Sequence, residues 1–153
     1  MASRKILYVC QEIMPYLPET ELSTLSRRLV QAMQERGNEI RTFMPRYGCI
    51  NERRNQLHEV IRLSGMNLII DDNDHQLIIK VASIPSARIQ IYFIDNDDFF
   101  ARKAVITDAE GNEFEDNDER AIFFARGVIE TVKKLRWQPG IVHCHGWFSA
   151  IAP

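Results

Sequence analysis

A strand, a helix and a second strand follow one another at the start of the chain. Residues Ile6–Cys10 form a continuous apolar run, which is typical of a strand buried on both faces. From Leu22 to Arg36 apolar side chains recur with the period of an amphipathic helix, and its predicted apolar stripe consists of Leu22, Leu25, Leu29 and Met33. Thr20 is able to cap its start and Gly37 is able to end it. Glu39–Met44 is again strand-like. Such a βαβ unit predicts a parallel sheet.

A second helix and a further buried strand are predicted near the end of the chain. The helix should run from about Asp116 to Arg136, with acidic residues in its first turn and basic residues in its last turn, which complements the helix dipole. Its predicted apolar stripe consists of Ile122, Ala125, Ile129 and Val132. After Pro139 and Gly140, residues Ile141–Cys144 form another strand, and a further helix is expected from Trp147 onward.

Between these parts the pattern predicts hairpins beside the parallel core. The predicted strands are Glu59–Leu63, Leu68–Ile70, Leu77–Ile84 and Ile89–Ile94, separated by turn-forming residues. The fold class expected is α/β: a Rossmann-like parallel sheet flanked by helices, with additional β-hairpins, in one domain over residues 1–153. Because Pro153 falls inside an expected helix, we expect this domain to be truncated.

Composition narrows the classes of partner. The 153 residues are 45% hydrophobic and 26% charged, as in an ordinary globular domain, and the formal net charge of -2 gives no basic surface for nucleic acid or an anionic membrane. With no signal peptide or membrane span in the sequence, we expect a cytoplasmic protein. Cys10, Cys49 and Cys144 are dispersed and odd in number, so they are expected to be reduced and mostly buried.

Two segments follow the carboxyl ends of predicted parallel strands, where open α/β sheets bind ligands. The first, after Cys10, leads into the helix that begins near Thr20. A helix start of this kind often holds phosphate, but no glycine precedes Gly37, and Glu19 and Glu21 would repel an anion. These acids either stabilise the helix start or have a functional role, and both readings remain open.

The second segment contains two histidines on one strand. His143 and His145 should share a face, with Cys144 on the opposite face. The pair could ligate zinc, although no third ligand is identifiable nearby. Alternatively, one histidine packs in the core while the other caps the next helix, or the pair contacts a ligand. The acidic runs Asp71–Asp74 and Asp108–Asp118 are interpreted as turns, caps and solvated surface.

The order of these pieces resembles the bacterial glycogen/starch synthase family of retaining glucosyltransferases over nearly the whole chain. The segments that carry the resemblance are Lys5–Val9, Glu12–Pro15, Gly37–Arg41, Pro45–Gly48, Ile91–Asp95, Asp116-Asn117 with Arg120, Pro139, Ile141–His145 and Trp147.

This resemblance implies a GT-B enzyme with two Rossmann-like domains, the second of them absent from this chain. Such an enzyme transfers glucose from ADP-glucose or UDP-glucose to an α-1,4-glucan in glycogen biosynthesis, with no metal or cofactor. It implies that His145 is the catalytic residue and hydrogen-bonds the transferred glucose. The substrate-binding residues implied or expected are Asp116, His143, Trp147 and Thr20.

The sequence departs from the family at several motif positions. Pro18–Leu22 stands where the family has the lysine- and glycine-containing donor motif KTGGL. Thr24 and Gly146 each replace an acidic residue, and Phe100 replaces a tyrosine. Two hypotheses therefore remain: a divergent glucan synthase whose second domain holds most of the nucleotide, or a non-catalytic relative that binds glucan or assembles with another subunit.

Overall fold

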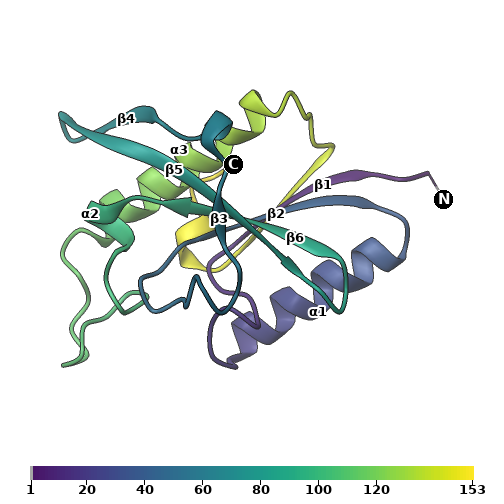
Figure 1. The fold of residues 1–153 in the computed structure, drawn as a ribbon, viewed down its shortest axis with the longest axis horizontal. Helices are drawn as coiled ribbons and strands as arrows, with labels where there is room; N and C mark the ends of the chain where they lie inside the picture. The colour runs from purple at the N-terminus through teal and green to yellow at the C-terminus, as the bar shows by residue number, and fades with distance from the viewer. Residues whose placement is uncertain (1) are drawn as a thin grey trace.

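The structure is a computed structural model that describes residues 2–153, so Met1 lies outside the described residues. It has a sheet in the order β3-β5-β6-β2-β1-β7, with β4 paired to β5 (Figure 1). The elements are β1 (Lys5–Cys10), α1 (Glu21–Glu35), β2 (Glu39–Pro45), β3 (His58–Glu59), η1 (Ile61–Leu63), β4 (Met66–Ile70), β5 (Asn73–Ile84), β6 (Ile89–Asp95), α2 (Asp97–Phe100), α3 (Asn117–Lys134), β7 (Ile141–His145) and η2 (Trp147–Ser149).

Strands β7, β1, β2 and β6 are parallel and form the core of the fold. The longest helices cover opposite faces of this sheet (Figure 1). Tyr8 of β1 points to α1, where its hydroxyl donates to Ser26 Oγ at 3.3 Å. On the other face, Gly127 of α3 lies so close to Ile94 of β6 that an added Cβ would be 2.9 Å from it. The predicted Rossmann-like parallel sheet with flanking helices is confirmed.

The long middle hairpins differ from the expectation in one respect. β5 pairs antiparallel with β4 and β6, and the two-residue turn between β4 and β5 places Asp71 and Asp72 in the left-handed region, as a hairpin of this length requires. β6, however, also pairs parallel with β2 through Thr42 and Ile91. The prediction that Ile89–Ile94 lies beside the parallel core is therefore wrong, because this strand is part of it.

Two predicted elements take shorter forms. In the predicted strand Glu59–Leu63, only Glu59 belongs to a strand, the two-residue β3, and Ile61–Leu63 forms a 3-10 turn. That turn buries Leu63 and leaves Ile61 74% exposed, a division that an extended strand would not produce between residues two apart. The helix expected from Trp147 is likewise a 3-10 turn that ends at Ser149.

The buried faces of the two main helices agree with the predicted stripes only in part. On α1 the buried residues are Ser23, Ser26 and Val30, whereas Leu25 is 48% exposed. On α3, Ala125 and Val132 of the predicted stripe are buried, but Ile122 is exposed, and Phe123, Phe124 and Val128 are fully buried in its place. Small hydroxyl side chains let α1 approach the sheet closely, so its buried face is not its most apolar one.

The three cysteines differ in burial. Cys10 is buried and Cys144 is half-buried, but Cys49 is exposed, so the expectation of mostly buried thiols holds for two of the three positions. Within residues 2–153, no helix combines the length and the apolar character needed to cross a bilayer.

Candidate functional site

The carboxyl ends of the parallel strands are tied together through Gln11, the residue that follows β1. Its amide donates to His145 O at 3.0 Å, its carbonyl accepts from Tyr47 Oη at 3.0 Å, and its side-chain Oε1 accepts from Phe148 N at 3.2 Å. Gln11 therefore joins the residues after β1, β2 and β7 into one rigid edge. This edge is where an open α/β sheet binds ligands.

The two histidines of β7 share one face of the sheet, as the strand period predicts. Their ring centroids are 6.5 Å apart, and the His143 ring stacks on the Tyr8 ring with centroids 4.8 Å apart and nearly parallel planes. His143 is thus packed against the face that α1 covers, while His145 stands one strand repeat closer to the carboxyl edge. The burial of His145 lowers its pKa from the usual value, and the neighbouring His143 lowers it further. His145 is therefore neutral near pH 7 and able both to donate and to accept a hydrogen bond.

Gly146 gives the chain a turn that no other residue would allow at this point. Its φ of +94° lies in the left-handed region, and an added Cβ would be 2.6 Å from Gln11 Cβ. An aspartate in the same backbone would collide with Gln11. Glycine at position 146 is thus required by the local backbone and by the close approach of Gln11.

The start of α1 is closed by its own side chains. Thr20 Oγ1 accepts from Ser23 N at 3.0 Å, and Ser23 Oγ accepts from Thr20 N at 2.9 Å, which completes a capping box. The Thr20 hydroxyl also lies 3.4 Å from Glu12 Oε1. Thr20 therefore acts as a helix cap, and its hydroxyl is already engaged.

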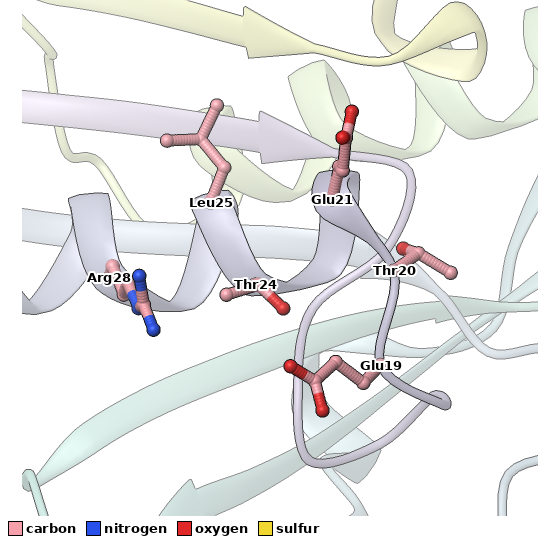
Figure 2. Close-up of a pocket in the computed structure, with 6 residues that line it drawn as sticks. All are labelled: Glu19, Thr20, Glu21, Thr24, Leu25 and Arg28. Carbon is pink, nitrogen blue, oxygen red and sulfur yellow. The ribbon is translucent and has the colours of Figure 1, made fainter.

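An open pocket of about 590 Å³ lies beside this helix start. Figure 2 shows the six side chains that line it, from the loop before α1 and from its first two turns: Glu19, Thr20, Glu21, Thr24, Leu25 and Arg28. The lining contains two carboxylates and one arginine, and no glycine lets the backbone approach a ligand. A pocket with this lining is a poor receptor for a diphosphate.

Asp116 lies at the N-cap position of α3 but makes no capping hydrogen bond with its side chain. Both of its carboxylate oxygens instead accept from Arg102, at the beginning of the loop that follows α2. This hydrogen bond lowers the pKa of Asp116 below its usual value, and the nearby guanidinium of Arg120 adds to the effect. Asp116 is therefore ionised, and Arg102 both orients the carboxylate and balances its charge.

Arg120 is the largest fully buried side chain of the chain, and sequence reasoning placed it only within the family motif. Its Nε donates to Phe99 O at 2.7 Å, and its Nη1 donates to Val105 O at 2.7 Å and to Asn117 Oδ1 at 2.8 Å. Arg120 thereby holds the loop between α2 and α3. An arginine near a helix start gives no local signal of burial, because its partners come from other segments.

Trp147 borders a smaller cavity on the other side of the edge. The cavity has a volume of about 260 Å³ and is lined by Ile106, Glu113, Asn117 and Trp147. The indole is 53% exposed, whereas the next residue, Phe148, is fully buried. Asn117, next to Asp116, thus faces the same cavity as Trp147.

An ion-pair network at the ends of β2 and β6 was not predicted from the sequence. Asp95 is 1% exposed and lies 2.8 Å from both Arg46 Nη2 and Lys80 Nζ, and Lys80 Nζ is 2.7 Å from Glu52 Oε1. Burial acts to lower the pKa of Lys80, but the hydrogen bonds to Asp95 and Glu52 outweigh it and raise the pKa. The buried Asp95 and Arg46, with the partly exposed Lys80 and Glu52, fix the segment after β2 on the edge.

The predicted site residues fall into two neighbouring groups. Gly146 lies beside Leu22 of α1, so the helix start near Thr20 adjoins the end of β7 with its histidines. Asp116 and Trp147 lie around the loop between α2 and α3. Among residues 2–153, no three His, Cys, Asp or Glu side chains are grouped so that they could hold a metal ion. The residues of this edge are suited to hydrogen bonding with a polar ligand.

Comparison with known proteins matches the chain over nearly all of its length. The family described as "Starch synthase catalytic domain" matches residues 5–153. Glycogen synthases of Chlorobium luteolum and Chlorobium limicola are each 40% identical over 150 residues, which is 97% of this chain and 31% of the relative. The glycogen synthase of Chlorobaculum tepidum is 40% identical over 148 residues, 96% of this chain and 30% of the relative.

A solved structure has the same fold. The catalytic domain of starch synthase IV from Arabidopsis thaliana, bound to ADP and acarbose, superposes with a TM-score of 0.82 at 20% sequence identity. The match covers 99% of this chain and 29% of the plant protein. This chain therefore spans about a third of the length of the relatives it matches, and it belongs to the starch synthase catalytic domain family.

Proposed function

We propose that residues 1–153 are the N-terminal part of a Rossmann-like domain in a GT-B glucosyltransferase of the glycogen synthase type. In this proposal a second domain lies in sequence that this chain does not contain. The proposal rests on one observation above all: the match to the family runs through the whole chain, including the histidine strand and its carboxyl edge. The proposed reaction transfers glucose from ADP-glucose or UDP-glucose to the end of an α-1,4-glucan. The expected cytoplasmic location remains a prediction.

His145 is the residue we assign to the transferred glucose. Its place at the carboxyl end of β7 points it toward the ligand edge, and its lowered pKa keeps the imidazole neutral. A neutral imidazole can hydrogen-bond a sugar hydroxyl without adding a second positive charge near the positively charged ring of the transition state. A hydrogen bond that strengthens as this charge develops lowers the barrier rather than only tightening binding. His143, stacked on Tyr8, would support His145 from behind.

The donor diphosphate is expected to rely on the second domain. Pro18 stands where the family motif has lysine, and Thr20 and Glu21 stand where it has glycine. Glu19 and Glu21 make the start of α1 acidic, and Thr20 is already engaged as a cap. Asp116, paired with Arg102, and Trp147 would then face the sugar-binding side of the cleft. In this arrangement the present chain supplies contacts to sugar, and the other domain supplies the positive charge for phosphate.

One observation favours a second candidate function. The same acidic helix start would suit a non-catalytic relative that keeps the fold to bind glucan or to assemble with another subunit. Such a protein would retain sugar contacts without any need for a phosphate site. The two candidates differ in whether glucose is transferred.

The test is transfer by the intact protein that contains this chain. ADP-glucose and UDP-glucose, each labelled in the glucose, are offered with glycogen as acceptor, and incorporated label is counted. We expect incorporation from at least one donor, and we expect it to fall sharply in His145→Ala. Binding of glycogen without incorporation from either donor would favour the non-catalytic candidate.

A further inference from the structure

Two neighbouring hollows lie at the amino ends of β1 and β7, at the opposite end of these strands from His145. Each has a volume of about 410 Å³, and both linings contain Gln138. The first hollow, at the end of α3, is lined by Val132, Lys133, Arg136, Trp137, Gln138 and Pro139. The second, beside the start of β1, is lined by Ser3, Arg4, Lys5, Gln138, Gly140 and Ile141. At a rise of about 3.3 Å per residue, the length of β1 separates the hollows from the carboxyl edge by about 17 Å.

We propose that the two hollows form one site for a small molecule that carries a phosphate monoester. The phosphate is assigned to Gln138, the residue that both linings share. The volume of each hollow is within the range of small-molecule sites. This inference goes beyond the proposed transfer of glucose and does not depend on it, because the site lies away from the carboxyl edge and both can be occupied at once.

The linings contain four cationic side chains and no carboxylate. Arg4, Lys5, Lys133 and Arg136 are all exposed. Among residues 2–153, only Lys133 of these four forms a salt bridge, with Glu130 at 3.1 Å. The chain as a whole has a net charge of -2, so this concentration of positive charge does not follow from its composition. A concave surface lined by one sign of charge attracts ligands of the opposite sign.

Every polar side chain of the linings can donate a hydrogen bond. Besides the four cations, the donors are the Ser3 hydroxyl and the Gln138 amide. Glu39, whose backbone amide donates to Arg4 O, lies in neither lining, and its Oε1 accepts from Trp137 Nε1 at 2.8 Å. A phosphate monoester carries a charge of about -1.5 to -2 at pH 7 and several acceptor oxygens, so it matches this set of donors.

The linings also have an apolar part, which favours an organic phosphate over the free ion. Val132 and Pro139 contribute to the first hollow, and Ile141, which is 36% exposed, contributes to the second. The organic part of a monoester can cover this surface and remove it from water, whereas inorganic phosphate cannot.

Arg136 has a backbone conformation that favours glycine. It follows Leu135, the C-cap of α3, with a φ of +51°, whereas the same position after α1 is taken by Gly37. A side chain in the left-handed region costs free energy that glycine would avoid. Lys133 and Lys134 already supply the positive charge that favours a helix end. The stability of α3 therefore does not account for an arginine at this position, whereas an anion site does.

The experiment is calorimetry of the intact protein at constant ionic strength, with phenyl phosphate and inorganic phosphate as the probes. We expect phenyl phosphate to bind with a Kd below about 1 mM, and more tightly than inorganic phosphate. Phenol, which lacks the phosphate, should not bind measurably, and added sodium chloride should weaken the binding of phenyl phosphate. A Kd for phenyl phosphate weaker than about 1 mM, or equal affinity for the two phosphates, would overturn the proposal.

Two arginine variants locate the bound phosphate. Arg136→Gly removes the guanidinium where glycine fits the backbone, so it should weaken binding of phenyl phosphate about tenfold without lowering Tm. Arg88→Gly is the matched control, because Arg88 is also exposed, has a φ of +54° and lies in neither lining. The Arg88→Gly protein should bind phenyl phosphate as the unchanged protein does. Equal weakening in both variants, or none in Arg136→Gly, would refute the site. Loss of binding in His145→Ala would place the phosphate at the carboxyl edge and would refute it as well.

Discussion

Replacing Arg120 by methionine is the substitution for which the structure predicts the largest loss of stability. Methionine keeps much of the buried volume but leaves three acceptors without a donor, namely Phe99 O, Val105 O and Asn117 Oδ1. In the unchanged protein these atoms accept hydrogen bonds of 2.7 to 2.8 Å from Arg120. Each buried acceptor left without a donor costs about 1–3 kcal/mol. The burial of Arg120 lowers its pKa to about 10, an effect to which Arg102 adds, so the guanidinium is still charged at neutral pH.

The opposing effect is that the substitution removes the cost of burying this charge. Desolvation of a buried guanidinium costs several kcal/mol, and the unpaired Nη2 recovers none of it. The cost of the three unsatisfied acceptors exceeds the desolvation cost that is recovered, so we expect Arg120→Met to lower the free energy of unfolding by about 3 kcal/mol. For a protein whose total stability is about 5–15 kcal/mol, that is a large fraction. It corresponds to a fall in Tm of about 10 °C.

Urea unfolding followed by circular dichroism measures this change, with Arg126→Met as the matched control. Arg126 lies on the same helix, is exposed, and makes one hydrogen bond, to Ile69 O at 2.6 Å. Its substitution should cost less than about 1 kcal/mol. If Arg120→Met unfolds within about 0.5 kcal/mol of the unchanged protein, which is the range of ordinary surface substitutions, the hydrogen bonds of Arg120 do not hold this loop as argued.

The remaining predictions concern the carboxyl edge. His145→Ala should lower kcat/KM of the intact enzyme about 10²-fold, whereas His143→Ala should mainly lower Tm; steady-state kinetics showing a fully active, folded His145→Ala enzyme would remove His145 from the site. Because the folded state lowers the pKa of His145, it binds this proton less tightly than the unfolded chain, so stability should fall as the pH drops below about 6.5. His145→Gln should flatten that fall in urea unfolding measured across pH 5–7, and an identical slope would contradict the assignment. Gly146→Asp should lower Tm by several degrees through its clash with Gln11, and an unchanged melting curve would show that the turn relaxes freely. Calorimetry of residues 1–153 with ADP-glucose or UDP-glucose should give a Kd weaker than about 1 mM; tighter binding would mean that the acidic helix start does hold a donor.

The elements of the parallel core follow from local pattern because burial on both faces requires a continuous apolar run. Ile6–Cys10 and Ile141–Cys144 carry such runs, and the structure has strands there, paired in parallel. Ile6–Cys10 is buried, but β7 is the last strand in the sheet order and leaves Ile141 36% and Val142 43% exposed, so the prediction of a buried strand there is wrong. Which face of a helix is buried was less predictable. The period of α1 identified Leu25 as inward, but close contact with Tyr8 brings Ser26 to the sheet instead. Helix orientation depends on the neighbouring surface as well as on hydrophobicity.

The position of β6 shows a similar limit. The apolar run Ile89–Ile94 predicted a strand, but not that it would pair parallel with β2 as well as antiparallel with β5. A strand's own residues define its two faces, whereas its neighbours depend on how the rest of the chain returns to the sheet.

The sequence by itself determined the α/β class, the common face of His143 and His145, and the family to which the chain belongs. Periodicity and the order of motifs are local signals that can be recognised in the sequence alone. Only the tertiary structure revealed that Arg120 is buried, that Asp95 joins Arg46 to Lys80, and that a cavity lies beside Trp147. Each of these depends on groups from separate segments, whose burial and charge are decided by folding and leave no pattern along the chain.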